Sequence, residues 1–341
     1  MDSRERVNAV LNGEMPDYMP VFPKIAFANV IACENMSIRE YMTDGGNMAE
    51  ACIAAYRTFG WDGVSLHTDI GSEGAALGSK YIQPENSPSE LNEYLMSSLE
   101  EIDKIKMVNP HDVYPMKVVI DAVKKVKKVI GDEAYVLAWT NSPLNIASQL
   151  LKLDNLLVSL ITEPELVHPV LEKCLEVAKR YAVCLLEAGA DAIAYGNATC
   201  SSSVISPAAY RIFSLPYEKQ LTAEIQKNGG KAVTHICGNI LPIIKDIAEN
   251  GADVIDFDHV CPVKELVEIL PNKVFRGNID PALLAYGTVD EVYKKTTELI
   301  DESGMSKKLL IGSGCEIPVI TPKENLHALV RAARDNGRLI H

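Results

Sequence analysis

The chain alternates short apolar segments with helical segments over most of its 341 residues, and this alternation restricts the fold more than any other feature. Eight segments have the length and composition of buried strands, at residues 18–22, 64–66, 134–138, 191–195, 231–237, 253–257, 273–277 and 308–312. Apolar strands that alternate with helices indicate a parallel sheet with helices on its outside. Eight of them favour an α/β fold of the (β/α)8 (TIM) barrel type over an open sheet. No glycine-rich dinucleotide motif follows the first strand, which weakens the open-sheet alternative further.

The helical segments give the chain its domain organisation. Residues 2–13 predict a helix that precedes the first strand, so the barrel has an N-terminal helical extension. Residues 67–115 follow the second strand and are rich in Gly, Ser, Pro and Asn, which predicts an irregular insertion or lid. The strand–helix alternation resumes after residue 115. We therefore expect a single barrel domain over residues 1–341, with the insertion inside it.

Composition excludes several classes of function. The net charge of −13 argues against nucleic acid as a partner, because no cluster of Lys and Arg overrides it. No apolar run approaches the ~20 residues that a membrane span needs. The charged start lacks the apolar core of a signal peptide, so we expect a cytoplasmic protein. In that setting the eight cysteines are expected to be thiols or metal ligands rather than disulfides.

One pair of residues predicts a metal site. His235 and Cys237 alternate along one predicted strand, so they point to the same side about 6.6 Å apart. Cys315 follows another predicted strand, in the sequence Gly312-Ser313-Gly314-Cys315. Barrel enzymes place their chemistry at the carboxyl ends of the strands, where all three residues lie. An imidazole and two thiolates would hold a soft divalent metal and leave one position open.

Other polar residues at the predicted strand ends complete the candidate site. By position alone we expect Asn197 and Asn278 to line a cofactor-binding pocket, together with His67 and Tyr195. Asp258 is a candidate catalytic residue, as a fourth ligand of the substrate-free metal. Its alternatives are a hydrogen-bond acceptor behind the ligands or the N-cap of a helix. His259 is a weaker alternative ligand. Glu316 would either select the substrate or face solvent.

Three stretches of the chain resemble a known family. The sequences at 235–239 (HICGN), 277–281 (GNIDP) and 314–318 (GCEIP) resemble the uroporphyrinogen decarboxylase superfamily, and within it the cobamide-dependent methyltransferases. The resemblance covers nearly the whole chain. It implies that His235, Cys237 and Cys315 bind Zn²⁺. It also implies that a corrinoid such as methylcobalamin, held on a partner corrinoid protein, exchanges a methyl group with a small thiol or another methyl donor or acceptor.

Two alternatives to this function stay open. Asp69 resembles the decarboxylase aspartate that faces the pyrroles of the substrate, which favours uroporphyrinogen decarboxylation and cofactor binding at Asp69. However, the segment after the first predicted strand contains Lys24 and no arginine, so a clamp for substrate carboxylates is missing. The other alternative is a non-catalytic corrinoid-binding protein. The direction of methyl transfer, the second substrate and the oligomeric state cannot be read from the sequence.

Overall fold

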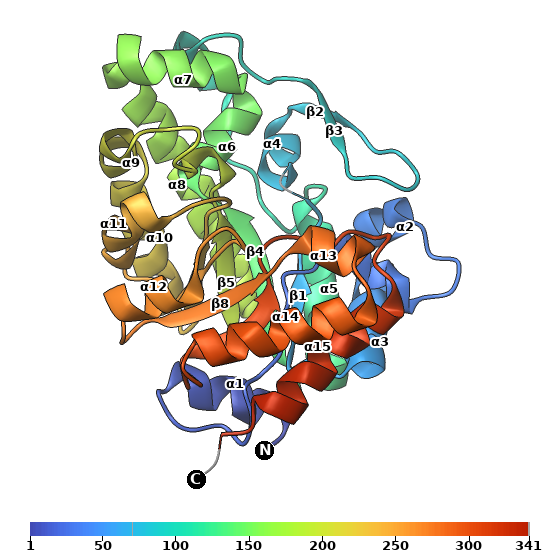
Figure 1. Ribbon diagram of the computed structural model, residues 1–341. Helices are drawn as coiled ribbons and strands as arrows, with labels where there is room; N and C mark the ends of the chain where they lie inside the picture. Colours follow the sequence, from blue (N-terminus) through green and yellow to red (C-terminus); the bar gives the residue numbers. More distant parts are fainter. Residues whose placement is uncertain (70, 340–341) are drawn as a thin grey trace.

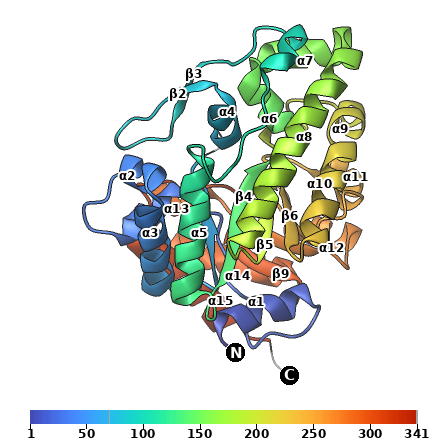
Figure 2. The same ribbon diagram turned by 180° about the vertical axis from the view of Figure 1, so that it is seen from behind.

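Seven parallel strands form the central sheet of the computed structural model, which describes residues 1–69 and 71–339 (Figure 1). Their order follows the chain: β1 (Gly63–Leu66), β4 (Tyr135–Asn141), β5 (Ala192–Gly196), β6 (Lys231–His235), β7 (Val254–Asp256), β8 (Val274–Ile279) and β9 (Leu309–Ser313). The sheet curls, and helices lie around its outer side (Figures 1 and 2). This arrangement agrees with the predicted α/β architecture.

The first predicted strand, residues 18–22, is not a strand of this sheet. It makes only isolated bridges, in which Val21 pairs with Ile311 of β9. Pro20 and Pro23 have no N–H to donate, so a regular ladder cannot form on both sides of this segment. The Phe22 amide still donates to the Ile311 carbonyl at 2.7 Å, and the Asp62 amide donates to the Val21 carbonyl at 2.8 Å. The segment therefore lies between β9 and the residue that precedes β1, at the two edges of the sheet.

Helices lie between the strands of the sheet, as the alternation of the sequence predicts. Residues 206–228 contain two of them, α9 and α10, which are divided at Ser214. The bounds are α1 (Ser3–Leu11), α2 (Ile38–Thr43), α3 (Gly45–Phe59), α5 (Met116–Ile130), α6 (Pro143–Leu150), α7 (Leu153–Thr162), α8 (Pro164–Glu187), α9 (Pro207–Phe213), α10 (Leu215–Lys227), α11 (Ile244–Ala248), α12 (Val263–Ile269), α13 (Pro281–Tyr286), α14 (Val289–Glu302) and α15 (Lys323–Asn336). Short 3-10 helices are η1 (Phe27–Ala32), η3 (Ala198–Cys200) and η4 (Leu241–Ile243).

The segment 67–115 is more regular than its composition predicts. It contains α4 (Ser72–Leu77), an antiparallel pair of strands β2 (Lys80–Ile82) and β3 (Glu90–Glu93), and the 3-10 helix η2 (Leu99–Lys104). Ile70, within this predicted insertion, lies outside the described residues. The segment runs along the edge of the molecule farthest from α1 (Figure 1). Its role as a lid stays a prediction.

Alternation along the strands sorts side chains between the two faces of the sheet. One apolar cluster contains Tyr135, Leu137 and Trp139 of β4, while Val136 and Ala138 belong to the main core. The residues that the other strands contribute to the first cluster are Ala192, Ala194, Val233, Val254, Val274 and Leu310. Val7 and Val10 of α1 pack into the first cluster, and α1 lies across the amino ends of the strands (Figures 1 and 2). Helix α1 thus closes the amino end of the sheet, and the carboxyl ends stay open for a site.

No single helix among the described residues has the length and apolar character to cross a membrane, although α6 and α7, bent by 116° to each other, pass the same test as a pair.

Candidate metal centre

Strand register brings a row of residues to the same level near the carboxyl end of the sheet. Gly196 of β5 pairs with His235 of β6, His235 pairs with Asp256 of β7, and Asp256 pairs with Arg276 of β8. In β6, β7 and β8 the residue two positions before this level is a valine, namely Val233, Val254 and Val274. These valines belong to the apolar cluster into which α1 packs. The inner face therefore changes from apolar to ionisable at one layer, and this layer is the floor of the site.

The three predicted ligands meet above this floor. One ligand atom each from His235, Cys237 and Cys315 lies within 4.8 Å of the others. His235 Nε2 lies 3.3 Å from Cys237 Sγ, and Cys237 Sγ lies 3.8 Å from Cys315 Sγ. His235 is buried, and the two cysteines are half-buried. Tertiary structure thus brings residues 78 positions apart into one cluster of soft donors.

The two thiols of this cluster are unequal. The pKa of Cys315 is lowered, first because Cys237 donates a hydrogen bond to its sulfur and also because Lys24 and His235 attract the thiolate. The pKa of Cys237 is raised, first by the same hydrogen bond and then by burial. Cys315 is consequently the member of the pair that more readily carries negative charge.

A buried ion pair stands behind the histidine. Asp256 Oδ2 lies 3.8 Å from His235 Nδ1, and Arg276 holds the same carboxylate with two hydrogen bonds, one of them Nε to Oδ1 at 2.7 Å. Asp256 and Arg276 are both about 3% exposed. Metal-binding histidines commonly direct their second nitrogen at a carboxylate, which fixes the ring and its tautomer. The Asp256–Arg276 pair therefore orients His235 with Nε2 toward the cysteines.

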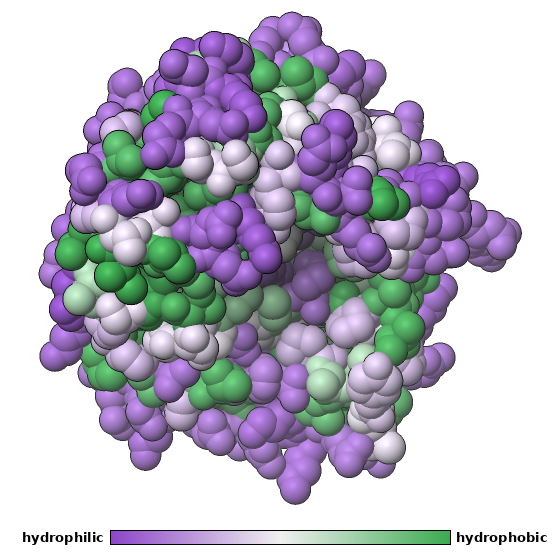
Figure 3. Space-filling view, turned by 90° about the horizontal axis from the view of Figure 1, so that it is seen from above, coloured by the Kyte–Doolittle hydropathy of each residue, from purple (hydrophilic) through white to green (hydrophobic). Residues whose placement is uncertain are grey.

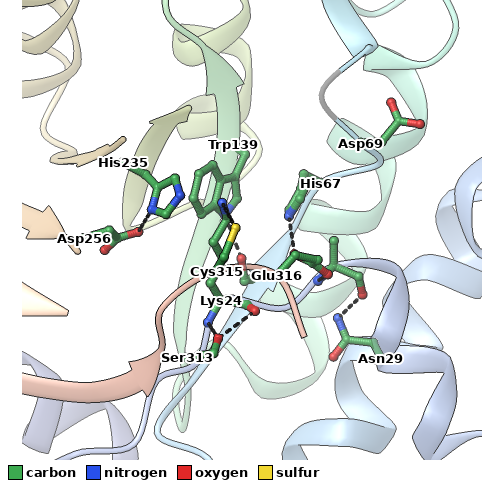
Figure 4. Close-up of polar contacts among 12 residues, drawn as sticks. Lys24, Asn29, His67, Asp69, Trp139, His235, Asp256, Ser313, Cys315 and Glu316 are labelled. Carbon is green, nitrogen blue, oxygen red and sulfur yellow. Dashed lines mark hydrogen bonds and ion pairs between the residues drawn. The ribbon is translucent and has the colours of Figure 1, made fainter. Parts of the chain in front are cut away.

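A cavity adjoins the ligands, and Figure 4 shows the side chains around it. Trp139 lies between two histidine rings, 5.1 Å from His67 and 6.0 Å from His235 between centroids. The Lys24 ammonium lies 4.8 Å from the centre of the Trp139 ring. The residues that line the cavity are Lys24, His67, Asp69, Ser72, Trp139, Thr140, Asn141, Asn145, Gly196, Asn197, Ala198, His235 and Cys237. A hollow with hydrophilic residues at its bottom is visible on the face opposite to α1 (Figure 3).

Asp258 and Asn278 support the ligand loops rather than the cavity. Asp258 Oδ2 accepts a hydrogen bond of 2.8 Å from the amide of Gly238, the residue after Cys237. Its other oxygen lies 2.6 Å from Nδ1 of His259. Asn278 Nδ2 donates to the carbonyls of Asp258 and Cys261, so its amide faces the loop after β7. This geometry favours the support role of Asp258, and coordination by Asp258 or His259 stays a prediction.

Asn197 and Asp69 line the cavity but have their polar atoms engaged. Asn197 is fully buried and donates to Ser214 and to the carboxylate of Glu218. Asp69 accepts from the amide of Gly71 at 2.9 Å and from the amide and hydroxyl of Ser89. Asp69 also lies apart from the group around Cys315 (Figure 4).

The predictions that Tyr195 and His67 line the pocket have different outcomes. The expectation that Tyr195 lines the pocket is wrong, because its hydroxyl pairs with Thr222 of α10 on the outer side of the sheet. The strand-end position of His67 does place it in the cavity wall. His67 Nε2 lies 3.5 Å from Glu316 Oε2, and the other carboxylate oxygen of Glu316 accepts from the Ala26 amide. Glu316 therefore faces the site and not the solvent alone.

A second group of ligand-type side chains lies elsewhere on the molecule. His111, Cys184 and Glu187 each bring one donor atom within 4.8 Å of the others, at the carboxyl end of α8. Glu187 is exposed and the other two are half-buried. Within residues 1–69 and 71–339 no ion pair joins the His111 ring to a buried carboxylate, and the group provides a control for the metal experiments below.

Three residues of the candidate site were not predicted from the sequence, namely Lys24, Asp256 and Arg276. Asp256 and Arg276 lie in otherwise apolar predicted strands, and a charged residue in such a strand is a usable signal because buried charges are normally paired. Lys24 lies in a proline-interrupted segment and carries no signal beyond its charge. Its place beside Cys315 depends on long-range pairing of that segment with β9.

The fold and the donor set define a class: an α/β protein with a cluster of soft donor atoms at the carboxyl ends of parallel strands. The chain belongs to the uroporphyrinogen decarboxylase family, because the profile of that family, Uroporphyrinogen decarboxylase (URO-D), matches residues 2–336. The family resemblance inferred from the three stretches is thereby confirmed.

Several named proteins are similar to the chain along most of its length. The chain is 26% identical to the methylcobamide:CoM methyltransferase MtbA of Methanosarcina acetivorans and 27% identical to that of Methanosarcina mazei, with 97% of each chain covered in both cases. It is 24% identical to the uroporphyrinogen decarboxylase of a Synechococcus strain, over 87% of this chain and 85% of that one. A solved methyltransferase from Methanosarcina mazei superposes with a TM-score of 0.90 at 23% identity, covering 98% of this chain and 99% of that chain. The last comparison establishes the shared fold.

Proposed function

We propose that this protein is a zinc-dependent methyltransferase that moves a methyl group between a corrinoid and a small thiol. The observation that supports it most is the convergence of His235, Cys237 and Cys315 beside the cavity. The relatives named for methyl transfer between a cobamide and CoM match along nearly the whole chain. CoM is therefore the first thiol to test.

The donor set fits Zn²⁺ chemically. Two thiolates cancel the charge of the ion, and a neutral imidazole completes three protein ligands with one position open to a substrate. His235 Nδ1 has no hydrogen-bond partner within the described residues but faces the Asp256 carboxylate, as expected for a histidine that binds metal through Nε2. Zinc bound here would supply positive charge that lowers the pKa of an incoming thiol and holds its thiolate.

The residues of the chain then have distinct tasks. The Asp256–Arg276 pair keeps His235 in one orientation. Trp139 fills the space between His67 and His235 and limits the water beside the ligands. In the transfer itself, the thiolate sulfur gives an electron pair to the methyl carbon. The electrons of the broken carbon–cobalt bond stay on the corrinoid cobalt, which changes from Co(III) to Co(I), so no external oxidant or reductant is needed.

The corrinoid would reach the site from the open face. Helix α1 covers the amino ends of the strands, so access to the ligands is from the hollow seen in Figure 3. A corrinoid carried by a partner protein would dock over this hollow. The protein would act on soluble partners in the cytoplasm.

The decarboxylase alternative has less support. It depends on Asp69, whose carboxylate already accepts hydrogen bonds from Gly71 and Ser89. Lys24 is the cation in the place where the decarboxylases carry arginines. A single ammonium gives a weaker grip on several carboxylates than bidentate guanidinium groups do.

Elemental analysis of the purified protein tests the metal. We expect about one zinc per chain, lost in Cys315→Ser and Cys237→Ser, because each removes one of three ligands. Cys184→Ser is the matched control, since it removes a thiol from the surface group of His111, Cys184 and Glu187. Wild-type protein prepared without chelator and free of zinc would contradict the proposal, as would zinc that is lost only in Cys184→Ser.

A methyl-transfer assay tests the reaction. CoM or another thiol should demethylate methylcobalamin in the presence of the wild-type protein, with the change in cobalt absorption as the readout. Cys315→Ser should reduce the rate to the uncatalysed level. Corrinoid binding without turnover would favour the non-catalytic alternative, and release of carbon dioxide from uroporphyrinogen would favour the decarboxylase.

A further inference from the structure

Lys24 is a cation without a carboxylate partner at the edge of the proposed metal site. Its Nζ lies 3.8 Å from Cys315 Sγ, and its ammonium lies over the Trp139 ring. Among the described residues it forms no salt bridge, although it lies beside a cavity and not on the open surface. Lys24 is half-buried and lines the cavity. A charge in such a place needs a compensating anion.

The position of Lys24 is fixed by the same strand that presents Cys315. The Lys24 amide donates to Ser313 Oγ at 3.1 Å, and that hydroxyl donates to the Lys24 carbonyl at 3.1 Å. The amide of Ile317 also donates to the Lys24 carbonyl. The backbone of Lys24 is thus bound on both sides of Cys315, at Ser313 and Ile317. The ammonium and the sulfur are therefore held as one unit.

The acidic side chains near the cavity contact groups other than Lys24. Asp256 is neutralised by Arg276, and Asp69 is held by Ser89 and Gly71. Glu316 binds the Ala26 amide and faces His67. Among the described residues the Lys24 ammonium therefore has no carboxylate partner, and its neighbours are the sulfur of Cys315 and the ring of Trp139.

The net charge of the proposed metal site indicates a role for the Lys24 ammonium. A divalent metal with two thiolates and a neutral imidazole has no net charge. A substrate thiolate adds one negative charge to this group, in a site with little water to screen it. An alcohol, an amine or an imidazole that enters as a neutral molecule adds none.

We propose that Lys24 is a positioning residue that supplies the counter-charge for the substrate thiolate and thereby makes the metal site selective for anionic over neutral ligands. The inference rests on the proposed function, because it assumes a metal held by His235, Cys237 and Cys315. It concerns a residue outside that ligand set. It therefore has a test of its own.

The test compares Lys24→Met, which keeps the length of the side chain without its charge, and Lys24→Arg, which keeps the charge. Each protein is loaded with Co²⁺ in place of zinc, and 2-mercaptoethanol is added while the sulfur-to-cobalt absorption is recorded. Imidazole, a neutral ligand, is titrated in parallel. We expect Lys24→Met to weaken thiol binding by about tenfold or more and to leave imidazole binding within about twofold. Lys24→Arg should restore most of the thiol affinity.

Each result points to one conclusion. Equal thiol affinity in wild type and Lys24→Met would overturn the role of Lys24, and so would an equal loss of thiol and imidazole affinity, which indicates a steric effect. Loss of metal from Lys24→Met alone would also overturn it, since Lys24 would then serve the ligands rather than the substrate. Failure of the wild-type protein to hold metal would overturn the proposed function and this inference together.

Discussion

The two ends of the central sheet differ in how their buried polar groups are paired. At the amino end, Asp62, Asp191 and Asp253 each accept a hydrogen bond from a backbone amide of the neighbouring strand or segment, at 2.8 to 2.9 Å. Each also pairs with a basic side chain, namely Arg6, Arg4 and Lys231. The acidic residues there join adjacent strands and leave no oxygen free for chemistry.

At the carboxyl end several buried polar atoms lack a hydrogen-bond partner among the described residues. They include His67 Nε2 and Glu316 Oε2. An unsatisfied buried polar group costs free energy, so such groups collect where a ligand or metal will satisfy them. The contrast indicates that the amino end carries stability and the carboxyl end carries function. Each end can be tested by a change that should spare the other.

The largest expected effect is on stability, from Arg6→Met at the amino end. This change leaves the carboxylate of Asp62 buried without its partner, and both side chains are less than 5% exposed. Breaking a buried pair costs about 3–5 kcal/mol. Guanidinium unfolding curves should show this loss, and the zinc content of the folded variant should equal that of wild type. Arg39→Met, which removes an exposed pair with Glu85, is the control and should cost less than about 1 kcal/mol. Similar losses of unfolding free energy in Arg6→Met and Arg39→Met would contradict the stabilising role of the buried pairs at the amino end.

A second prediction compares the two ends of one strand. Asp256→Asn at the carboxyl end of β7 should weaken zinc binding by about 10- to 100-fold, because it removes the charge that orients His235. Asp253→Asn, just before the same strand, should leave zinc affinity unchanged and lower only stability. Competition with a chelator of known affinity measures both. Equal zinc affinities in the two variants would show that Asp256 does not act through the histidine.

Much of the fold follows from local sequence signals. Strands β4 to β9 were predicted within a few residues because each is a short apolar run bounded by a turn, and helices such as α8 are long and amphipathic. Gly189 and Gly251 adopt positive φ where the sequence repeats Gly-Ala-Asp, as expected for residues that end a helix. The segment 18–22 looks like a strand by composition, but its prolines prevent a regular ladder. The strand prediction failed there because a regular ladder needs backbone N–H donors, and a pattern of apolar residues does not show where these donors are missing.

The site was predictable only in part. His235 and Cys237 are two residues apart on one strand, so local periodicity brings them together, and the glycines beside Cys315 identify a third ligand. Asp256, Arg276 and Lys24 join them through strand register and through the pairing of residues 20–22 with β9. Such long-range pairing leaves no local pattern. The candidate ligands were therefore predicted from the sequence, and the charged groups beside them became visible only in the structure.

The smallest effect concerns acid stability at the amino end. Burial raises the pKa of Asp17, but hydrogen bonds and attraction from Arg6 outweigh it and lower the pKa from 3.8 to about 2. The unfolded chain then binds more protons than the folded one between pH 3.8 and about 2. The stabilisation by Asp17 is therefore complete above this window and is lost as the pH falls through it. Because Asp17 is 38% exposed, we expect solvent screening to reduce this contribution to about 1 kcal/mol. Urea unfolding at pH 5 and pH 2.5 should show a smaller acid loss in Asp17→Asn than in wild type. An equal loss of stability in Asp17→Asn and wild type would mean that the Asp17 carboxylate does not contribute to the paired charges at the amino end of the sheet.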